Sequence, residues 1–343
     1  MFPPRYNLMY NCHMKEINWD TRTPGPIRQV FPDIFDGMIS THLAPSGITG
    51  QTLPQPLEVA DIKEACKRLS EVAERGFTRA ESRLGRSGIA TTGKAAISLC
   101  RRIEHLRESI FLLLEQMEFY SAKVLQRSIL DHHLRLLYLY ERYQVDKTDA
   151  AGTEYYSVSD TNEHLQYARA LADIEQILKS DSRGAGKSIH EILQEYYEQY
   201  KNVSMKEVRE KARTFTYRSV IHYLAKSMWE RISAKDVRLY DNPVLLSGYL
   251  FVYFQLSSYV HGGWHAEQEL TQAESEKRLL QAKLKLLAFH TFQTDLISKC
   301  LVMDLLSAIN SRLSNLVTEM NQVTRHVTYS NLLRWDGAVG TLE

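Results

Sequence analysis

The sequence has almost no proline after residue 56. Eight of its nine prolines lie in residues 1–56, and only Pro243 follows them. Proline lacks a backbone N–H donor and interrupts helices, so residues 1–56 are predicted to form an extended arm. The same scarcity leaves the rest of the chain free to form long helices.

Closely spaced cysteines are also missing. Cys12, Cys66, Cys100 and Cys300 form no Cys-x-x-Cys pair and no ladder of short spacings. This argues against a disulfide framework and indicates a reducing compartment. The first residues, MFPPRYNLMYNC, lack the charged start and continuous apolar centre of a signal peptide. We therefore expect a cytoplasmic protein.

Neither sign of charge is in excess. Lys and Arg number 42 against 41 Asp and Glu, and the formal net charge is +1. This excludes a bulk electrostatic attraction to nucleic acid or an anionic membrane, so any basic site must be local. The most apolar run, residues 244–260, is too short to span a bilayer and contains Gln255 and three serines. We expect no membrane association.

What the sequence does contain is a helical pattern from Leu57 to Leu333. Apolar residues recur at spacings of three and four, and no segment alternates convincingly with a period of two. The predicted class is all-α, a helical bundle with helices near residues 58–84, 94–116, 118–145, 162–181, 187–201, 204–233, 243–261 and 272–322. The predicted divisions are the arm (1–56), two halves of a helical core (57–145 and 240–333), a polar helical insertion between them (146–239), and a tail (334–343).

Two predicted helices, 124–140 and 244–261, have apolar residues around their whole circumference, which is typical of helices buried on most sides. Polar residues on such helices need partners or a purpose, because an unpaired buried polar group costs roughly 1–3 kcal/mol. On the first helix, Arg127, Asp131 and Arg135 share one side at spacings of four, and neighbouring opposite charges there can pair. Ser128 and His132 lie beside them.

The second helix ends in FQLSSYVHGGWH, residues 254–265. Ser257 and His261 are four residues apart, and His261 falls in the last turn, where unpaired carbonyls favour an imidazolium. Gly262 or Gly263 can take the left-handed conformation that ends a helix. His261 is therefore expected next to an opening, where it could titrate near neutrality.

These two motifs resemble those of a known family. RSILDHHLRLLY resembles the Arg-Ser-x-x-acidic helix of a mostly prokaryotic family of uncharacterised helical proteins, and LSSYVHGG is similar to its later helix end, with Trp229 ahead of it. That family is similar in turn to HEPN domains, helical bundles whose signature is arginine, four to six residues, then histidine. Arg127 with His132 or with His133 fits that spacing. The resemblance as a whole covers residues 94–145 and 240–264. Ser128 replaces the asparagine or aspartate often found second in the signature.

The resemblance implies a metal-independent endoribonuclease that acts as an effector in prokaryotic antiphage defence or in a toxin system. Arg127 would stabilise the phosphorane, His132 or His261 would transfer the proton, and Asp131 would orient one of these groups. The supporting residues would be Ser257, Ser128, Tyr253, Tyr259 and Arg135. No cofactor and no metal are expected, and the partners would be RNA or a nucleotide and a protein of the defence system.

A second function remains open at this point. Histidine before glycine is an ordinary helix end, and an Arg–Asp pair is often structural. The same polar pocket could therefore belong to a non-catalytic sensor or adaptor that binds a nucleotide, RNA or a protein partner.

Three other signals point to function only weakly. DSRGAGKS, residues 181–188, resembles a phosphate-binding P-loop but lacks its first glycine and follows a predicted helix instead of a strand. In HGGWHAE, two glycines break the spacing that would aim His261 and His265 at one metal ion. A basic run with interleaved aromatic residues, from Tyr200 to Arg218, is more typical of a solvated helix face than of an RNA track.

The run from Gln272 to Gln322 lacks glycine and proline and would reach about 75 Å as one helix. We expect it to bend near residues 291–294, or to pack against another copy or a partner. A homo-oligomer is the working expectation. The interface would use its leucines: Leu280, Leu284, Leu287, Leu301, Leu305 and Leu316.

Overall fold

The chain folds into helices where its apolar residues recur every three or four positions, and no strand occurs among the described residues. The computed structural model describes residues 58–178, 187–234, 252–253, 255–275 and 277–339. The all-α prediction is confirmed. The predicted arm, residues 1–56, lies outside the described residues.

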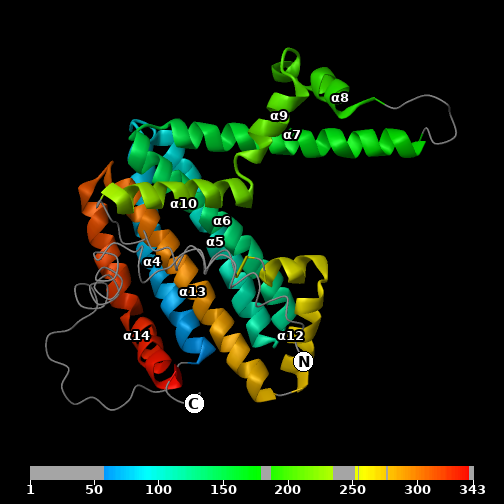
Figure 1. The fold of residues 1–343 in the computed structure, drawn as a ribbon. Helices are drawn as coiled ribbons and strands as arrows, with labels where there is room; N and C mark the ends of the chain where they lie inside the picture. The colour runs from blue at the N-terminus through cyan, green and yellow to red at the C-terminus, as the bar shows by residue number, and fades with distance from the viewer. Residues whose placement is uncertain (1–57, 179–186, 235–251, 254, 276, 340–343) are drawn as a thin grey trace. The chain divides into compact units, whose positions relative to one another are not determined.

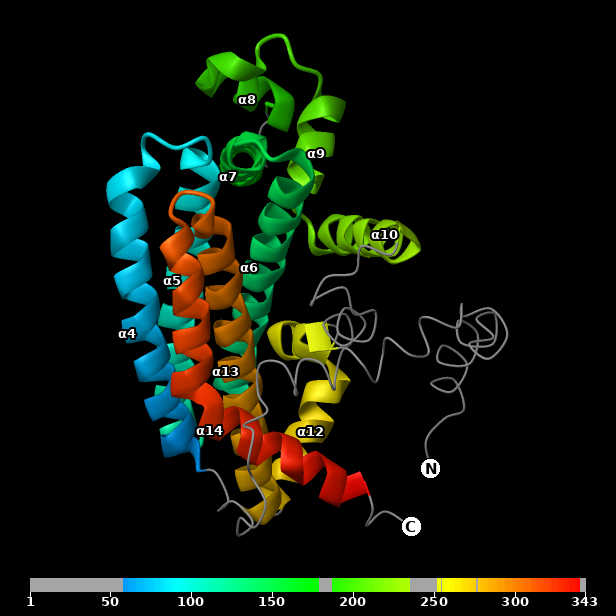
Figure 2. The same ribbon diagram turned by 90° about the vertical axis from the view of Figure 1, so that its left-hand side faces the viewer.

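Five long helices lie side by side (Figure 1, Figure 2). They are α4 (Val59–Leu84), α5 (Ala90–Glu115), α6 (Phe119–Asp146), α13 (Lys277–Ser307) and α14 (Ser314–Val339). α5 and α6 form a hairpin, α13 packs against α4, α5 and α6, and α14 returns along α13 and α4. The main core lies between these helices and includes Leu99, Leu134, Val302 and Met303.

α7 (Ala150–Leu178) packs on α5 and α6 and then continues away from them (Figure 1). Its outer part packs with α8 (Ile189–Tyr196), η1 (Glu198–Tyr200) and α9 (Met205–Arg213) around a small separate core centred on Leu165 and Leu193. α10 (Tyr217–Ala234) returns to α6, and α12 (Trp264–Ser275) packs against α13 and α6.

The hairpin is tied to α7 by Asp149. Its carboxylate accepts hydrogen bonds from the backbone amides of Thr91 (2.8 Å) and Thr92 (2.6 Å), in the first turn of α5, where amides lack partners within the helix. Partial burial raises the pKa of Asp149, but the bonds from Thr92 and Thr91 outweigh it and the pKa is lowered. The helix predicted from residue 162 instead begins at Ala150, directly after Asp149.

Two predicted helices prove to be interrupted without glycine or proline. The helix expected over 204–233 divides into α9 and α10, because Phe215 turns inward against the rings of Tyr138 and Tyr155. The helix expected over 272–322 ends at Ser307, and residues 308–313 turn the chain into α14. α14 extends to Val339, past residue 334, where the predicted tail begins.

α13 is continuous through residues 291–294, where a bend was predicted, so the helix is not interrupted there. Thr294 Oγ1 and Ser298 Oγ donate to carbonyls four residues earlier, so both hydroxyls are satisfied inside a regular helix. The predicted interface between copies through the leucines of residues 272–322 is also wrong. The chain folds back as α14, and the core buries these side chains. Leu284, Leu287, Leu301, Leu305 and Leu316 are buried, and Leu280 is partly buried.

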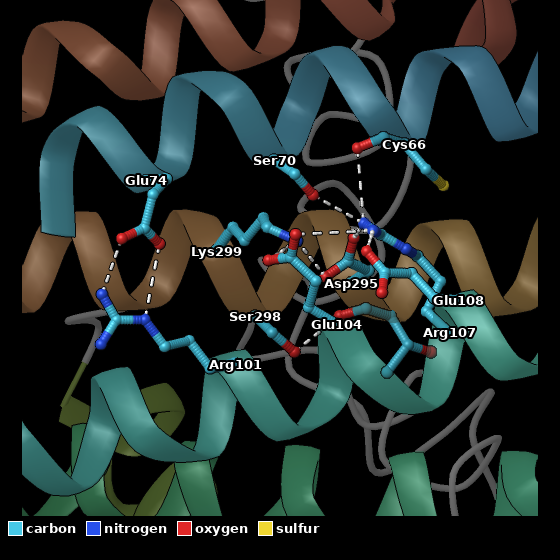
Figure 3. Close-up of polar contacts among 11 residues, drawn as sticks. Cys66, Ser70, Glu74, Arg101, Glu104, Arg107, Glu108, Asp295, Ser298 and Lys299 are labelled. Atoms are coloured by element: carbon cyan, nitrogen blue, oxygen red, sulfur yellow. Dashed lines mark hydrogen bonds and ion pairs between the residues drawn. The ribbon is translucent and has the colours of Figure 1, made fainter.

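A buried ionic network joins α4, α5 and α13 (Figure 3). Asp295 accepts hydrogen bonds from Arg107 Nη1 and Lys299 Nζ, each at 2.5 Å, and all three side chains are buried. Arg107 also donates to Ser70 Oγ at 2.9 Å, and Glu104 lies 3.3 Å from Lys299 Nζ. Burial raises the pKa of Asp295, but Lys299 and Arg107 outweigh it and the pKa is lowered. The network therefore stays ionised inside the bundle.

None of the described helices combines the length and the hydropathy needed to cross a membrane.

Candidate functional site

Arg127 on α6 is the centre of the candidate site. Its Nη1 pairs with Asp131 one turn later, and its Nε donates to Ser257 Oγ at 3.3 Å. Among the described residues, Nη2 has no hydrogen-bond partner. Partial burial lowers the pKa of the guanidinium, and Asp131 opposes that shift. An arginine stays protonated at any ordinary pH, so the site holds a fixed cation.

Two stacked aromatic rings support this cation. The Arg127 Cζ lies 3.2 Å from the centroid of the Tyr253 ring, and the Tyr217 ring stacks on Tyr253 with a centroid distance of 3.4 Å. Arg127 and Tyr217 cannot share one face of the ring, so Tyr253 lies between them. Tyr253 was predicted as a wall of the site, a role that stays a prediction, whereas Tyr217, from α10, was not identified from the sequence.

His261 ends the helical residues 255–261. Gly262 has φ +65°, and the backbone N–H of Gly263 donates to the Ser258 carbonyl at 2.7 Å, which closes the helix as predicted. His261 is exposed. Ser257 and His261 lie one helical turn apart, about 5–6 Å between Cβ atoms. His261 therefore lies about one turn from the residue that contacts Arg127.

The direction of this segment separates the two candidate histidines. Ser257 contacts Arg127, and two residues later the Tyr259 carbonyl accepts a hydrogen bond from Tyr120, near the start of α6. The segment thus runs towards the beginning of α6, and His261 lies on that side of Arg127. His132 lies on the other side, towards the end of α6.

His132 lies near two cations, Arg135 and Arg102. Burial lowers the pKa of its imidazole to about 4, with help from Arg135 and Arg102. Its Nδ1 is buried and makes no hydrogen bond with any described residue. His132 is therefore neutral at pH 7, and its low pKa makes it a weaker proton acceptor than a histidine near neutrality. Arg135 forms no ion pair within the described part of the chain, and the half-buried Ser128 makes no hydrogen bond with a described residue.

Two sequence predictions do not fit the observed positions. Tyr259 is buried and donates its hydroxyl proton to Glu269 Oε2 at 2.5 Å, so it packs in the core and cannot line an open pocket. His133, the alternative partner of Arg127 in the signature, is fully buried against Ser298 at 2.8 Å. It points to α13, away from solvent.

The structure also locates parts of the basic run, of the P-loop-like segment and of the second predicted buried helix. Two aromatic residues of the basic run, Tyr200 and Phe215, are buried in two hydrophobic cores and offer no stacking surface. The third, Tyr217, is the residue that stacks on Tyr253. Most of the P-loop-like segment lies outside the described residues, and the helix α7 precedes it, not a strand. Half of the buried helix predicted over 244–261 lies outside them too, and in its described part Val260 is 48% exposed.

The sequence also contained an overlooked signal on α6. Lys123 lies one turn before Arg127, so it extends the stripe of Arg127, Asp131 and Arg135. Its ammonium group lies 3.9 Å from Glu269 on α12. Two basic groups therefore occupy neighbouring turns of α6.

Comparison with known proteins gives one family. The family described as a family of unknown function (DUF5677) matches residues 93–278, which include α5, α6 and the described helix end at His261. The curated proteins and the solved structures contain no match to the chain.

Proposed function

Because the chain belongs to the DUF5677 family, whose function is unknown, we propose from its own residues that it is a metal-independent, HEPN-like endoribonuclease. The observation that supports this most is the setting of Arg127. A fixed cation is held by Asp131, Ser257 and a stacked tyrosine, and its Nη2 has no described partner. An exposed His261 lies about one helical turn from Ser257, the residue that contacts Arg127.

The proposed reaction needs only groups of this kind. RNA supplies its own nucleophile, and removal of the 2′-hydroxyl proton lets O2′ attack the adjacent phosphorus while the P–O5′ bond breaks. The products are a 2′,3′-cyclic phosphate and a 5′-hydroxyl, whose proton comes from an acid. Arg127 would stabilise the phosphorane through Nη2, and His261 would take the 2′-hydroxyl proton. His132 is the weaker candidate because of its lowered pKa.

A ribonuclease assay in EDTA tests the proposal. Wild-type protein should cleave RNA and leave cyclic phosphate ends, and Arg127→Ala and His261→Ala should each lower the rate roughly 100-fold. Arg142→Ala is the matched control, since Arg142 also lies on α6 and pairs with an aspartate four residues later at 3.1 Å. His326→Ala controls for loss of an exposed histidine. Equal rates in all five proteins would identify a contaminating nuclease and remove the proposal.

The alternative is a non-catalytic binding module. It is favoured by one observation, that two nitrogens of Arg127 already have protein partners. In that case wild-type protein would bind RNA or a nucleotide without cleaving it, and Arg127→Ala would weaken binding.

The role in antiphage defence or as a toxin remains a prediction with its own test. Expression of the wild type in a bacterial host should arrest growth or block phage, and the Arg127→Ala variant should do neither. The cytoplasmic location and the homo-oligomer also remain predictions, the latter without the leucine interface that first suggested it.

A further inference from the structure

A second cluster of charges lies beside the start of α6. Glu269 on α12 is shared by two lysines, Lys283 on α13 at 3.3 Å and Lys123 on α6 at 3.9 Å. Tyr259 donates its hydroxyl proton to the other oxygen of the carboxylate. Three helices thus bring two ammonium groups to a single carboxylate.

The two ammonium groups are partly buried over aromatic rings. The side chains of Lys123 and Lys283 are 19% and 18% exposed, and that of Glu269 is 20% exposed. Lys123 Nζ lies 5.2 Å from the centroid of Phe119, and Lys283 Nζ lies 5.9 Å from the same ring. The Phe119 ring lowers the local dielectric constant, while both lysine side chains stay partly exposed.

The charges of this cluster do not balance within the described residues. Lys123 donates no hydrogen bond to any described side chain or carbonyl, although an ammonium group has three donors. His290 adds no negative charge and stays neutral at pH 7, because burial and then Lys123 lower its pKa to about 4. By contrast, the buried cations Arg107 and Lys299 share two carboxylates. A partly buried cation without an acceptor is costly unless something else supplies one.

We propose that Lys123 and Lys283 form a binding site for a phosphoryl group, held between their two ammonium groups. A phosphate monoester carries a charge of about −1.5 to −2 near pH 7 and several acceptor oxygens, which suits two cations with unused donors. Two sources share this chemistry: free phosphate or a small phosphorylated molecule, and the terminal phosphate of an oligonucleotide. An oligonucleotide could contact both sites at once, since Lys123 lies one turn from Arg127 on α6. The proposal does not require that the Arg127 site cleaves RNA.

Neutralising Glu269 and neutralising the lysines should change the affinity for phosphate in opposite directions. Glu269 competes with the phosphoryl group for both lysines, so its neutralisation should strengthen binding while neutralisation of either lysine should weaken it. A structural ion-pair cluster would not show this reversal.

Thermal unfolding of the full chain in sodium phosphate and in sodium chloride of equal ionic strength measures the first source. Phosphate should raise the unfolding temperature saturably. Lys123→Gln and Lys283→Gln should weaken the apparent affinity about tenfold, and Glu269→Gln should strengthen it. Lys285→Gln is the matched control on the same helix, because Lys285 is more exposed and pairs with Glu58. No phosphate-specific shift, or equal shifts in the two lysine variants and the wild type, would overturn a free-phosphate site.

Titration with a 5′-phosphorylated oligonucleotide and its 5′-hydroxyl form measures the second source. Tighter binding of the phosphorylated form, lost in Lys283→Gln, would identify nucleic acid as the ligand. Arg127→Ala should retain this preference, which separates the lysine site from the proposed cleavage site. If neither inorganic phosphate nor the terminal phosphate changes binding or stability, the proposal is wrong.

Discussion

The guanidinium of Arg127 and the ring of Tyr253 are in stacking contact, with the Arg127 Cζ 3.2 Å from the ring centroid. The contact joins α6 to the segment that ends at His261, two parts of the chain more than 100 residues apart. It fixes the plane of the guanidinium, because Asp131 and Ser257 hold two of its nitrogens while the ring holds its face.

Removing this ring should disturb the orientation of Arg127 without removing its charge. Tyr253→Leu should lower RNA cleavage or binding about tenfold, since a partly desolvated cation–π contact is worth roughly 1–2 kcal/mol. Tyr253→Phe keeps the ring and should retain most of the activity. The cleavage rate or the dissociation constant for RNA distinguishes the two variants, and equal loss in both would assign the effect to the hydroxyl group instead of to stacking.

The buried ion pair of Asp295 should be essential for stability. Asp295→Ala leaves Lys299 and Arg107 without their shared buried partner, so the free energy of unfolding should fall by about 3–5 kcal/mol. Glu319→Ala removes the partner of Arg75 in an exposed pair and should cost less than about 1 kcal/mol. Urea denaturation measures both, and similar losses in the two variants would contradict a special role for the buried network.

Much of the bundle was predictable because its helices follow their apolar periodicity. The predicted bounds of the helices at 58–84 and 118–145 agree with α4 and α6 within one residue. The break before α10 was not predictable in the same way, because no glycine or proline marks it. The break depends on a tertiary contact, because the Phe215 ring packs against Tyr138 and Tyr155 in the folded core.

The candidate site shows the same division. The pairing of Arg127 with Asp131 follows from their spacing on one helix. The stacking of Tyr217 on Tyr253 does not, because spacing within a helix says nothing about which other helix packs beside it. Similarly, the sequence placed Tyr259 among the pocket residues, whereas its burial depends on α12 supplying Glu269 to its hydroxyl.

Gly152 marks a close approach of α7 to α5. A Cβ atom added there would fall on the backbone of Thr91 and Thr92, which cannot move aside as a flexible side chain would. Gly152→Ala should therefore destabilise the protein by about 1–3 kcal/mol, although alanine is the better helix former. At Gly85, which ends α4 in a right-handed conformation, an added Cβ meets nothing within 4 Å. Gly85→Ala should be neutral or stabilising by up to about 1 kcal/mol, and thermal unfolding of both variants checks the contrast.

The stability of the protein should fall as the pH drops below neutrality, because three histidines resist protonation in the folded state. Burial lowers the pKa of His133 to about 3, and burial also lowers those of His132 and His290 to about 4. In the unfolded chain a histidine has a pKa near 6.5, so between pH 6.5 and about 4 the unfolded state binds more protons. The neutral histidines thus stabilise the fold fully above pH 6.5, and this contribution is lost on acidification.

The fully buried His133 gives the sharpest test of that pH dependence. His133→Asn can keep a hydrogen bond to Ser298, which contacts Nδ1, while it removes the titrating group. Between pH 7 and pH 5, the free energy of unfolding of the variant should fall by about 1–2 kcal/mol less than that of the wild type. His326→Asn changes an exposed histidine and should leave the wild-type slope intact. Denaturant unfolding at the two pH values measures the slopes, and parallel slopes for His133→Asn and the wild type would show that His133 is not the group that makes the fold acid-sensitive.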